Sequence, residues 1–122
     1  MPCLKGVPST IALILTSAPG WAHHSFSMFD LQRQISLTGT VREFQFNNPH
    51  CFIQLVVETD GRPEEWSIEM GAPAHLIRQG WKHSTLRPGD KISITINPLR
   101  NGGKGGNYVA ASSEGRALGV AP

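Results

Sequence analysis

The sequence predicts an all-β domain, a small OB-like barrel of five strands with one short helix between the third and fourth strands. Three observations predict this fold. Short runs alternate apolar and polar residues with the period of two that strands require. Thirteen glycines and nine prolines supply frequent turns. The expected order of elements, strand, strand, strand, helix, strand, strand, is that of an OB barrel. A small β-sandwich is the alternative.

The first two strands are expected over residues 35–46 and 51–58. In the first strand Leu37, Gly39 and Val41 alternate with polar residues, and the glycine predicts a bulge or a sharp coil. The second strand places four side chains on its core face: Cys51, Ile53, Leu55 and Val57.

The third strand should follow the second through a tight hairpin, because Asp60-Gly61 is a strong hairpin signal. Trp66, Ile68 and Met70 then alternate with polar residues, so these three side chains are expected to face the core. Their clean alternation makes this the most clearly half-buried strand of the chain.

A short helix is expected over residues 71–80. Pro73 suits the first turn of a helix, and Gly80 suits its left-handed end. In that ending Trp81 would pack back on Leu76. No Ser, Thr or Asp precedes Pro73 to cap the helix start.

The last two strands follow a second set of turns. Pro88-Gly89 fits the centre of a type II turn and leads into a strand over residues 91–97, with its isoleucines facing inward. A glycine-rich loop over residues 100–107 is expected before the final strand at 108–113. That loop opens onto a strand, so it lacks the helix N-terminus of a phosphate-binding loop.

Residues 1–22 are expected to be a cleaved secretory signal, followed by a domain over 23–118 and a tail over 119–122. Lys5 precedes a short apolar run, and Gly20 and Ala22 occupy the small-residue positions of a cleavage site. The apolar run is far shorter than the ~20 residues of a spanning helix, so no stable membrane anchor is expected. The mature protein should therefore be periplasmic or secreted.

Charge and cysteine content limit the partners and the covalent framework. The net charge of +2 gives no basic surface of the kind that nucleic acid attracts, so nucleic acid is not expected as a partner. An unknown periplasmic ligand or protein is expected instead. Cys3 lies in the signal, and the mature chain keeps only Cys51, which excludes an intrachain disulfide.

Several short segments together resemble one known family. They are AHHSF at 22–26, LTGTV at 37–41, NNPH at 47–50, LIRQGW at 76–81 and LRPGD at 86–90. The ordered set resembles an exported bacterial family catalogued as domain-of-unknown-function family 6152, over residues 22–118. The resemblance implies a small periplasmic protein with an OB-like barrel, and it brings no established activity or catalytic residues. Cys51 replaces an expected small residue such as Ala, and Ala72 replaces an expected capping Ser.

Histidines offer the one hint of chemistry. Cleavage after Ala22 would make His23 the first residue, whose amine and ring nitrogen can chelate a metal ion. His24 could complete a nitrogen set that favours copper(II), and His50 is a further candidate ligand. Period-two alternation places His50 and Cys51 on opposite faces, so the two should not share a metal. The alternative is a solvated N-terminus and a turn histidine with no metal role.

No residue constellation supports catalysis. The expected function is therefore that of a small exported binding or accessory protein that uses a face of the barrel. Phe44, Phe46 and Phe52 could form a stacking surface on that face, or could pack in the core and at its rim. The alternative function is that of a copper-binding protein using His23, His24 and His50.

Overall fold

The computed structural model describes residues 2–3 and 26–119, and residues 26–119 carry all the secondary structure discussed below. Most of the expected signal, including its cleavage site, lies outside the described residues. The proposed domain boundaries therefore stay predictions. The elements are η1 (Phe26–Met28), β1 (Ile35–Gln45), β2 (Phe52–Thr59), β3 (Arg62–Glu69), α1 (Pro73–Arg78), β4 (Lys91–Pro98), β5 (Gly105–Ser113) and β6 (Arg116–Ala117).

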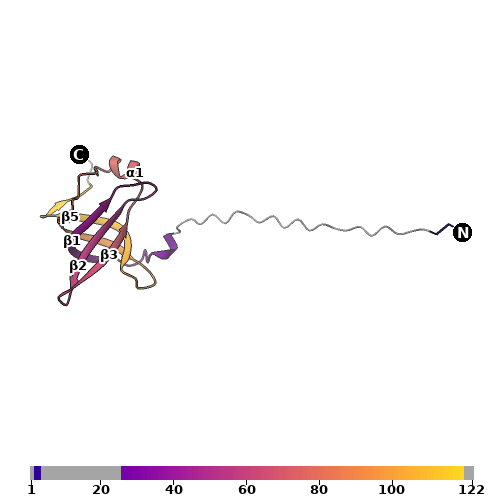
Figure 1. The fold of residues 1–122 in the computed structure, drawn as a ribbon, viewed down its shortest axis with the longest axis horizontal. Helices are drawn as coiled ribbons and strands as arrows, with labels where there is room; N and C mark the ends of the chain where they lie inside the picture. The colour runs from indigo at the N-terminus through magenta and orange to yellow at the C-terminus, as the bar shows by residue number, and fades with distance from the viewer. Residues whose placement is uncertain (1, 4–25, 120–122) are drawn as a thin grey trace.

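The strands close into a barrel. They follow the order β3-β2-β1-β4-β5-β6, and a parallel pairing of β3 with β5 joins the two sides of the sheet. The helix α1 lies between β3 and β4 in sequence and stands at one end of the barrel (Figure 1). The predicted five-stranded OB-like barrel is confirmed, and β6 adds a two-residue strand that pairs only with β5.

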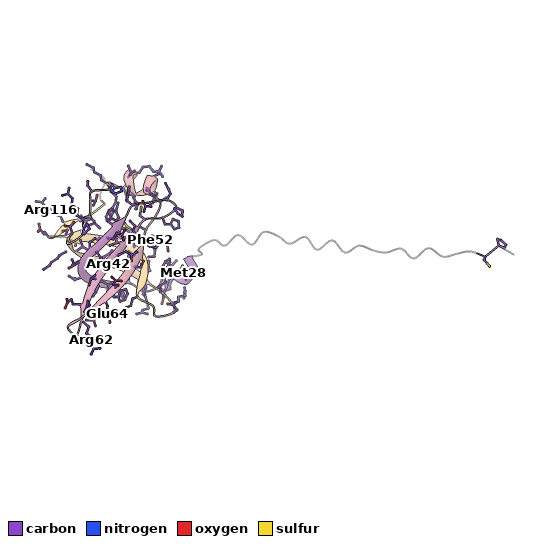
Figure 2. All side chains as sticks on the ribbon, in the orientation of Figure 1. Met28, Arg42, Phe52, Arg62, Glu64 and Arg116 are labelled. Carbon is purple, nitrogen blue, oxygen red and sulfur yellow. The ribbon has the colours of Figure 1, made fainter. Side chains whose placement is uncertain are left out.

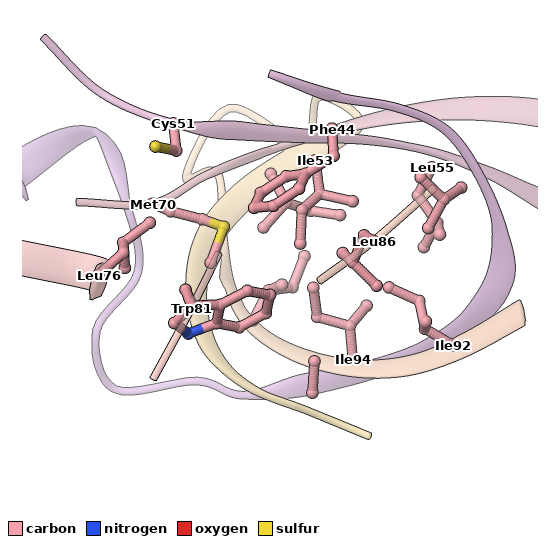
Figure 3. Packing of buried hydrophobic residues seen from close by; sticks show 14 of the residues in the cluster. Phe44, Cys51, Ile53, Leu55, Met70, Leu76, Trp81, Leu86, Ile92 and Ile94 are labelled. Carbon is pink, nitrogen blue, oxygen red and sulfur yellow. The ribbon is translucent and has the colours of Figure 1, made fainter. Parts of the chain in front are cut away.

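The core follows the alternation of the sequence. The inward side chains of β2, β3 and β4 meet beneath α1, where Leu76 and Trp81 close the end of the barrel (Figure 3). Trp81 packs edge-on against Tyr108 at a ring-centroid distance of 5.6 Å. The fully buried side chains include Trp81, Ile53, Leu55, Ile68, Leu76, Ile92, Ile94, Ile96, Val41 and Cys51.

The long strand β1 pairs with two neighbouring strands. Its first half pairs with β4 and its second half with β2. The register with β2 shifts between Val41 and Glu43, which is the bulge that the sequence predicts near this point. Gly39 sits where a Cβ atom would lie 2.4 Å from the carbonyl oxygen of Val56, so only glycine permits this close crossing.

The last long strand begins earlier than expected. The sequence predicts a loop through residue 107, whereas β5 begins at Gly105. Here the strand lies between β3 and β4, and each neighbour approaches the backbone closely. A Cβ atom on Gly105 would lie 2.9 Å from the Ser67 carbonyl oxygen, and one on Gly106 would lie 2.5 Å from that of Asn97. These glycines are strand residues that let the barrel close.

The turns agree with their sequence signals. Asp60 and Gly61 both have positive φ, 52° and 75°, as a tight hairpin turn requires. Gly80 has φ 94°, and the amide of Trp81 donates to the Leu76 carbonyl at 3.0 Å, which ends α1 and places Trp81 in the core. The helix covers residues 73–78, shorter than the expected 71–80, and no side chain caps its start at Ala72.

The segment before β1 is fixed to the loop between β4 and β5. Phe29 is only 4% exposed and forms an isolated bridge with Leu99. The amide of Asp30 donates to the Pro98 carbonyl at 2.8 Å, and the amide of Arg100 donates to the Met28 carbonyl at 2.9 Å. The Nε of Arg100 also donates to the Ser27 carbonyl at 2.9 Å. This N-terminal segment and the β4–β5 loop therefore hold each other in place.

Candidate functional site

One side of the barrel gathers the outward side chains of β1, β2 and β3, which we call the β1–β3 face. The strand register sets three neighbouring pairs across it: Phe52 with Glu69, Gln54 with Ser67, and Val56 with Glu65. In OB barrels the second and third strands form the centre of the ligand-binding face. The β1–β3 face consists of Glu43, Gln45, Phe52, Gln54, Val56, Glu58, Glu65, Ser67 and Glu69, with Arg42 at the bulge.

The polar groups of this face bind one another. Gln54 Nε2 donates to Gln45 Oε1 at 3.1 Å, and Gln45 Nε2 donates to Glu43 Oε2 at 3.3 Å. Arg42 Nε lies 2.9 Å from Glu65 Oε1. Four carboxylates therefore share the β1–β3 face with one guanidinium, so the face is acidic although the whole chain carries a charge of +2.

A small apolar pocket lies at one end of the β1–β3 face, and we call it the Phe52 pocket. Its volume is 160 Å³. Phe52, Phe29 and Leu99 supply apolar walls, and Met28 stands on the same side of the barrel as Phe52 (Figure 2). Glu69 and Lys104 supply charged groups. The pocket is lined by Met28, Phe29, Phe52, Ser67, Glu69, Leu99, Lys104, Gly105 and Gly106.

Beside the pocket His50 is held by a carboxylate. His50 Nδ1 lies 2.6 Å from Glu69 Oε1, and the two side chains are 40% and 15% exposed. Because an ionised carboxylate only accepts hydrogen bonds, Nδ1 of His50 is the donor in this contact. Within residues 26–119 no hydrogen bond to Nε2 is present. A carboxylate on one ring nitrogen is the arrangement that orients a histidine toward a metal ion.

Cys51 lies on the other side of the strand, as the alternation predicts. Its side chain is 0% exposed and belongs to the core. Burial raises the pKa of the Cys51 thiol, while a hydrogen bond with the Asn47 backbone lowers it less. The protonated thiol is therefore favoured, and Cys51 does not face the same space as His50.

The other predicted residues do not assemble around His50. His23 and His24 lie outside the described residues. His75 Nε2 lies 3.2 Å from Gln79 Nε2 on α1, and His83 packs edge-on against Phe46. Within residues 2–3 and 26–119, no group of three or more His, Cys, Asp or Glu side chains is placed to hold a metal ion.

The expected phenylalanine surface is only partly present. Phe44 is buried and packs against Trp81 at a ring-centroid distance of 5.8 Å. Phe46 contacts Phe44 and His83 at the rim of the core. Phe52 stands on the β1–β3 face and lines the Phe52 pocket.

Glu69 and Lys104 are site residues that sequence reasoning missed. Glu69 reads as an ordinary surface charge on an alternating strand, and Lys104 as part of a loop. Glu69 pairs with Phe52 across the β2–β3 ladder, and Phe52 follows His50 by two residues. This strand register is the signal that reveals Glu69. Lys104 reaches the site because the parallel β3–β5 pairing brings its loop against β3, where its Nζ lies 3.2 Å from Glu64 Oε1.

A closed barrel with the helix between the third and fourth strands, and a pocket on its β2–β3 side, defines an OB-like protein. The chain belongs to the Family of unknown function (DUF6152), whose model matches residues 12–108. The predicted family is confirmed. No curated protein matches the chain.

A solved structure shares the fold. A crystal structure of Rim1, a mitochondrial single-stranded DNA binding protein from S. cerevisiae, matches with a TM-score of 0.51 and 10% identity, over 69% of this chain and 95% of that chain. A selenomethionine-labelled crystal of Rim1 matches with a TM-score of 0.46 and 11% identity, over 67% and 93% of the two chains.

The prediction that excluded nucleic acid as a partner is wrong. It rested on the small net charge, whereas the chain shares its fold with a single-stranded DNA binding protein. The physical error is that a ligand meets one face of a barrel, and the charge of the whole chain does not describe that face. Among the described residues, no helix is long and apolar enough to cross a membrane.

Proposed function

We propose that this chain is a small exported binding protein that holds its ligand on the β1–β3 face, centred on the Phe52 pocket. The observation that carries the proposal is the pocket's position, where β2, β3 and the β4–β5 loop meet. This is the region that OB barrels use for their ligands. An apolar pocket surrounded by paired polar groups is suited to recognition, because the pocket supplies binding energy and its rim supplies selectivity.

Export is supported by the sequence alone. The short apolar run and the small residues Gly20 and Ala22 fit a cleaved signal. A domain without a disulfide then depends on its core, and the continuous buried cluster of residues 41–111 supplies one. A periplasmic location fits a binding or accessory role for this domain.

The face is tested by amide chemical-shift mapping on protein recovered from an exporting host. Three probes are added in turn: a basic peptide, a single-stranded oligodeoxynucleotide and Cu(II). A ligand of the β1–β3 face should shift the amides of Phe52, Ser67 and Lys104 and leave those of Ser93 and Ser112 on the opposite side unchanged. If every probe that binds shifts only the Ser93 and Ser112 side, the assignment of the binding face is refuted.

A second candidate function is copper binding, favoured by the contact of His50 with Glu69. His50 Nε2 would be the ligand from the barrel, with Glu69 orienting the ring. His23 and His24 would supply the other nitrogens. Met28 and Glu69 line the same pocket, and two residues separate His23 from Phe26, so an extended chain spans about 10 Å over these three residue steps.

Copper titration of processed variants tests this candidate. His50→Ala should weaken Cu(II) binding by at least about tenfold, and Glu69→Gln by about tenfold through the lost orientation. Cys51→Ala should leave the affinity unchanged, because its thiol is buried in the core. An affinity that depends on Cys51 and not on His50 would eliminate this candidate.

A further inference from the structure

We infer that the Phe52 pocket accepts one apolar side chain of an extended peptide, and that a basic side chain of the same peptide lies against Glu65. This inference rests on the proposed function and names the class of partner for the same face. It combines the size of the pocket, the charge of the face and the spacing of residues along β3.

The size of the pocket limits its occupant to one small apolar group. A cavity of about 150 Å³ lined by apolar side chains holds a benzene molecule. The Phe52 pocket measures 160 Å³ and is walled mainly by Phe29, Phe52 and Leu99. A leucine, methionine or phenylalanine side chain therefore fills it, and a larger ring system does not fit.

The pocket is formed before any ligand arrives. Met28 and Phe29 form part of its wall. They are held by the Phe29–Leu99 bridge and by the hydrogen bond that the Arg100 backbone amide donates to the Met28 carbonyl. Gly105 and Gly106 form another part, and both are fixed between β3 and β4. A preformed pocket loses little conformational entropy on binding, which favours a single-side-chain anchor.

The charges around the pocket favour a cationic partner. Glu43, Glu58 and Glu65 lie along the face, and Glu69 lies at the pocket itself. Two of the nearby cations have carboxylate partners: Arg42 contacts Glu65 at 2.9 Å, and Lys104 contacts Glu64 at 3.2 Å. Lys91 lies beside Val56 and Glu58, away from the pocket. A lysine or arginine side chain of a partner finds several carboxylates on this face.

An extended peptide matches the spacing of these groups. Side chains on one side of an extended chain repeat every two residues, about 6.8 Å. Ser67 and Glu69 line the pocket. Glu65 lies on the same side of β3, two residues before Ser67 and four residues before Glu69. A peptide aligned with β3 therefore places a basic residue on Glu65 when that residue stands two or four positions from the apolar anchor. Odd spacings point the basic side chain away from the face.

The amide groups of the face suit a peptide backbone. Gln54 and Gln45 are linked at 3.1 Å and keep further amide donors and acceptors for a ligand. The hydroxyl of Ser67 lies between the pocket and Glu65 and can both donate and accept. These neutral groups can satisfy peptide N–H and C=O groups along the path between the two anchors.

The test uses synthetic peptides and two pairs of matched variants of the full chain. The reference peptide carries leucine and a lysine four positions away in an otherwise Gly/Ser sequence, and its affinity is measured by fluorescence anisotropy. Two altered peptides replace the leucine with serine or move the lysine to an odd spacing of three. Each change should weaken binding by about tenfold if both anchors are used.

The first protein pair fills the pocket. Ser67→Trp places a large side chain at the pocket mouth, whereas Ser36→Trp places the same side chain on the exposed outer side of β1, away from the pocket. Ser67→Trp should weaken binding of the reference peptide by at least about tenfold, and Ser36→Trp should weaken it by less than about twofold. Urea unfolding of both variants confirms that each still folds.

The second pair removes charge. Glu65→Gln should weaken binding of the peptide by about threefold to tenfold. The effect should be smaller at high salt, because salt screens this exposed contact. Glu114→Gln, at the β5–β6 turn, removes an equal charge outside the face and should have no effect. Swapping the peptide lysine for neutral glutamine should abolish the difference between Glu65→Gln and the parent chain.

The outcomes separate this inference from the proposed function. One outcome is that peptides change the amide chemical shifts of the β1–β3 face, while Ser67→Trp binds the reference peptide normally and the parent chain binds the leucine-to-serine peptide normally. In that case the pocket inference is wrong and the proposed binding face stands. If the oligodeoxynucleotide shifts the face and no peptide does, nucleic acid is the ligand class and the inference is wrong. If every binding probe shifts residues outside the face, both proposals fail.

Discussion

Replacing Gly106 with alanine tests whether close backbone approach closes the barrel. The added Cβ atom would lie 2.5 Å from the Asn97 carbonyl oxygen and 2.7 Å from Ile96 Cδ1. The first neighbour is backbone within β4, so it cannot rotate away, and β5 cannot withdraw because β3 pairs with it on the other side. The strain must therefore separate strands that the fold needs joined.

The expected cost is that of overpacking, about 1–3 kcal/mol, out of a total stability of roughly 5–15 kcal/mol. For a domain of this size each kcal/mol lowers the melting temperature by about 4–8 °C. Urea unfolding followed by tryptophan fluorescence measures the change, with the buried Trp81 and the half-buried Trp66 as reporters.

Gly71→Ala is the matched control. Its Cβ atom would meet only the His75 side chain, at 3.2 Å, and that side chain can move. The control should change stability by less than about 0.5 kcal/mol, as surface substitutions commonly do. If Gly106→Ala unfolds at the same urea concentration as Gly71→Ala and the parent chain, close packing of β5 does not close this barrel.

Three further predictions concern the core, the buried thiol and export. Ile94→Ala should lower the free energy of unfolding by about 2–5 kcal/mol, because Ile94 is buried and its truncation leaves a cavity; an unchanged urea midpoint would contradict its inward placement. In a Cys3→Ser chain the native protein should not react with a thiol reagent until it is unfolded, and fast labelling of native protein would refute a buried Cys51. Because burial raises the Cys51 pKa above its usual 9.0, its contribution to stability is full below pH 9 and is lost as pH rises through the folded pKa. The intact mass of protein recovered after export should match a chain that begins at His23. A mass that includes residues 1–22 would exclude cleavage between Ala22 and His23.

Strands with clean alternation could be predicted from the sequence. Ile53, Ile68 and Ile94 all lie inside the barrel, because a period of two places every second side chain on one face. The start of β5 could not be predicted in the same way. Gly105 and Gly106 have no side chains to show a period, and their need for glycine comes from β3 and β4, which approach from distant parts of the sequence.

The candidate site was less accessible to sequence reasoning. The outward position of His50 follows from local alternation against Cys51, and the structure agrees. His50 lies just before β2 and its partner Glu69 ends β3, so the contact depends on the pairing register of β2 with β3. The acidic β1–β3 face was hidden for a related reason, since Glu43, Glu58 and Glu65 come together only when three strands align.

The parallel pairing of β3 with β5 has a consequence for the order in which a growing chain completes the Phe52 pocket. Synthesis delivers the N-terminus first, so β1, β2 and β3 are available while β5 is still unmade. The first half of β1 then has no β4 to pair with, and Phe29 has no Leu99. The Phe52 pocket also lacks Gly105 and Gly106 at this stage. A nascent or C-terminally truncated chain therefore has the residues of the β1–β3 face and no complete pocket, because the pocket is finished only when β5 has been added.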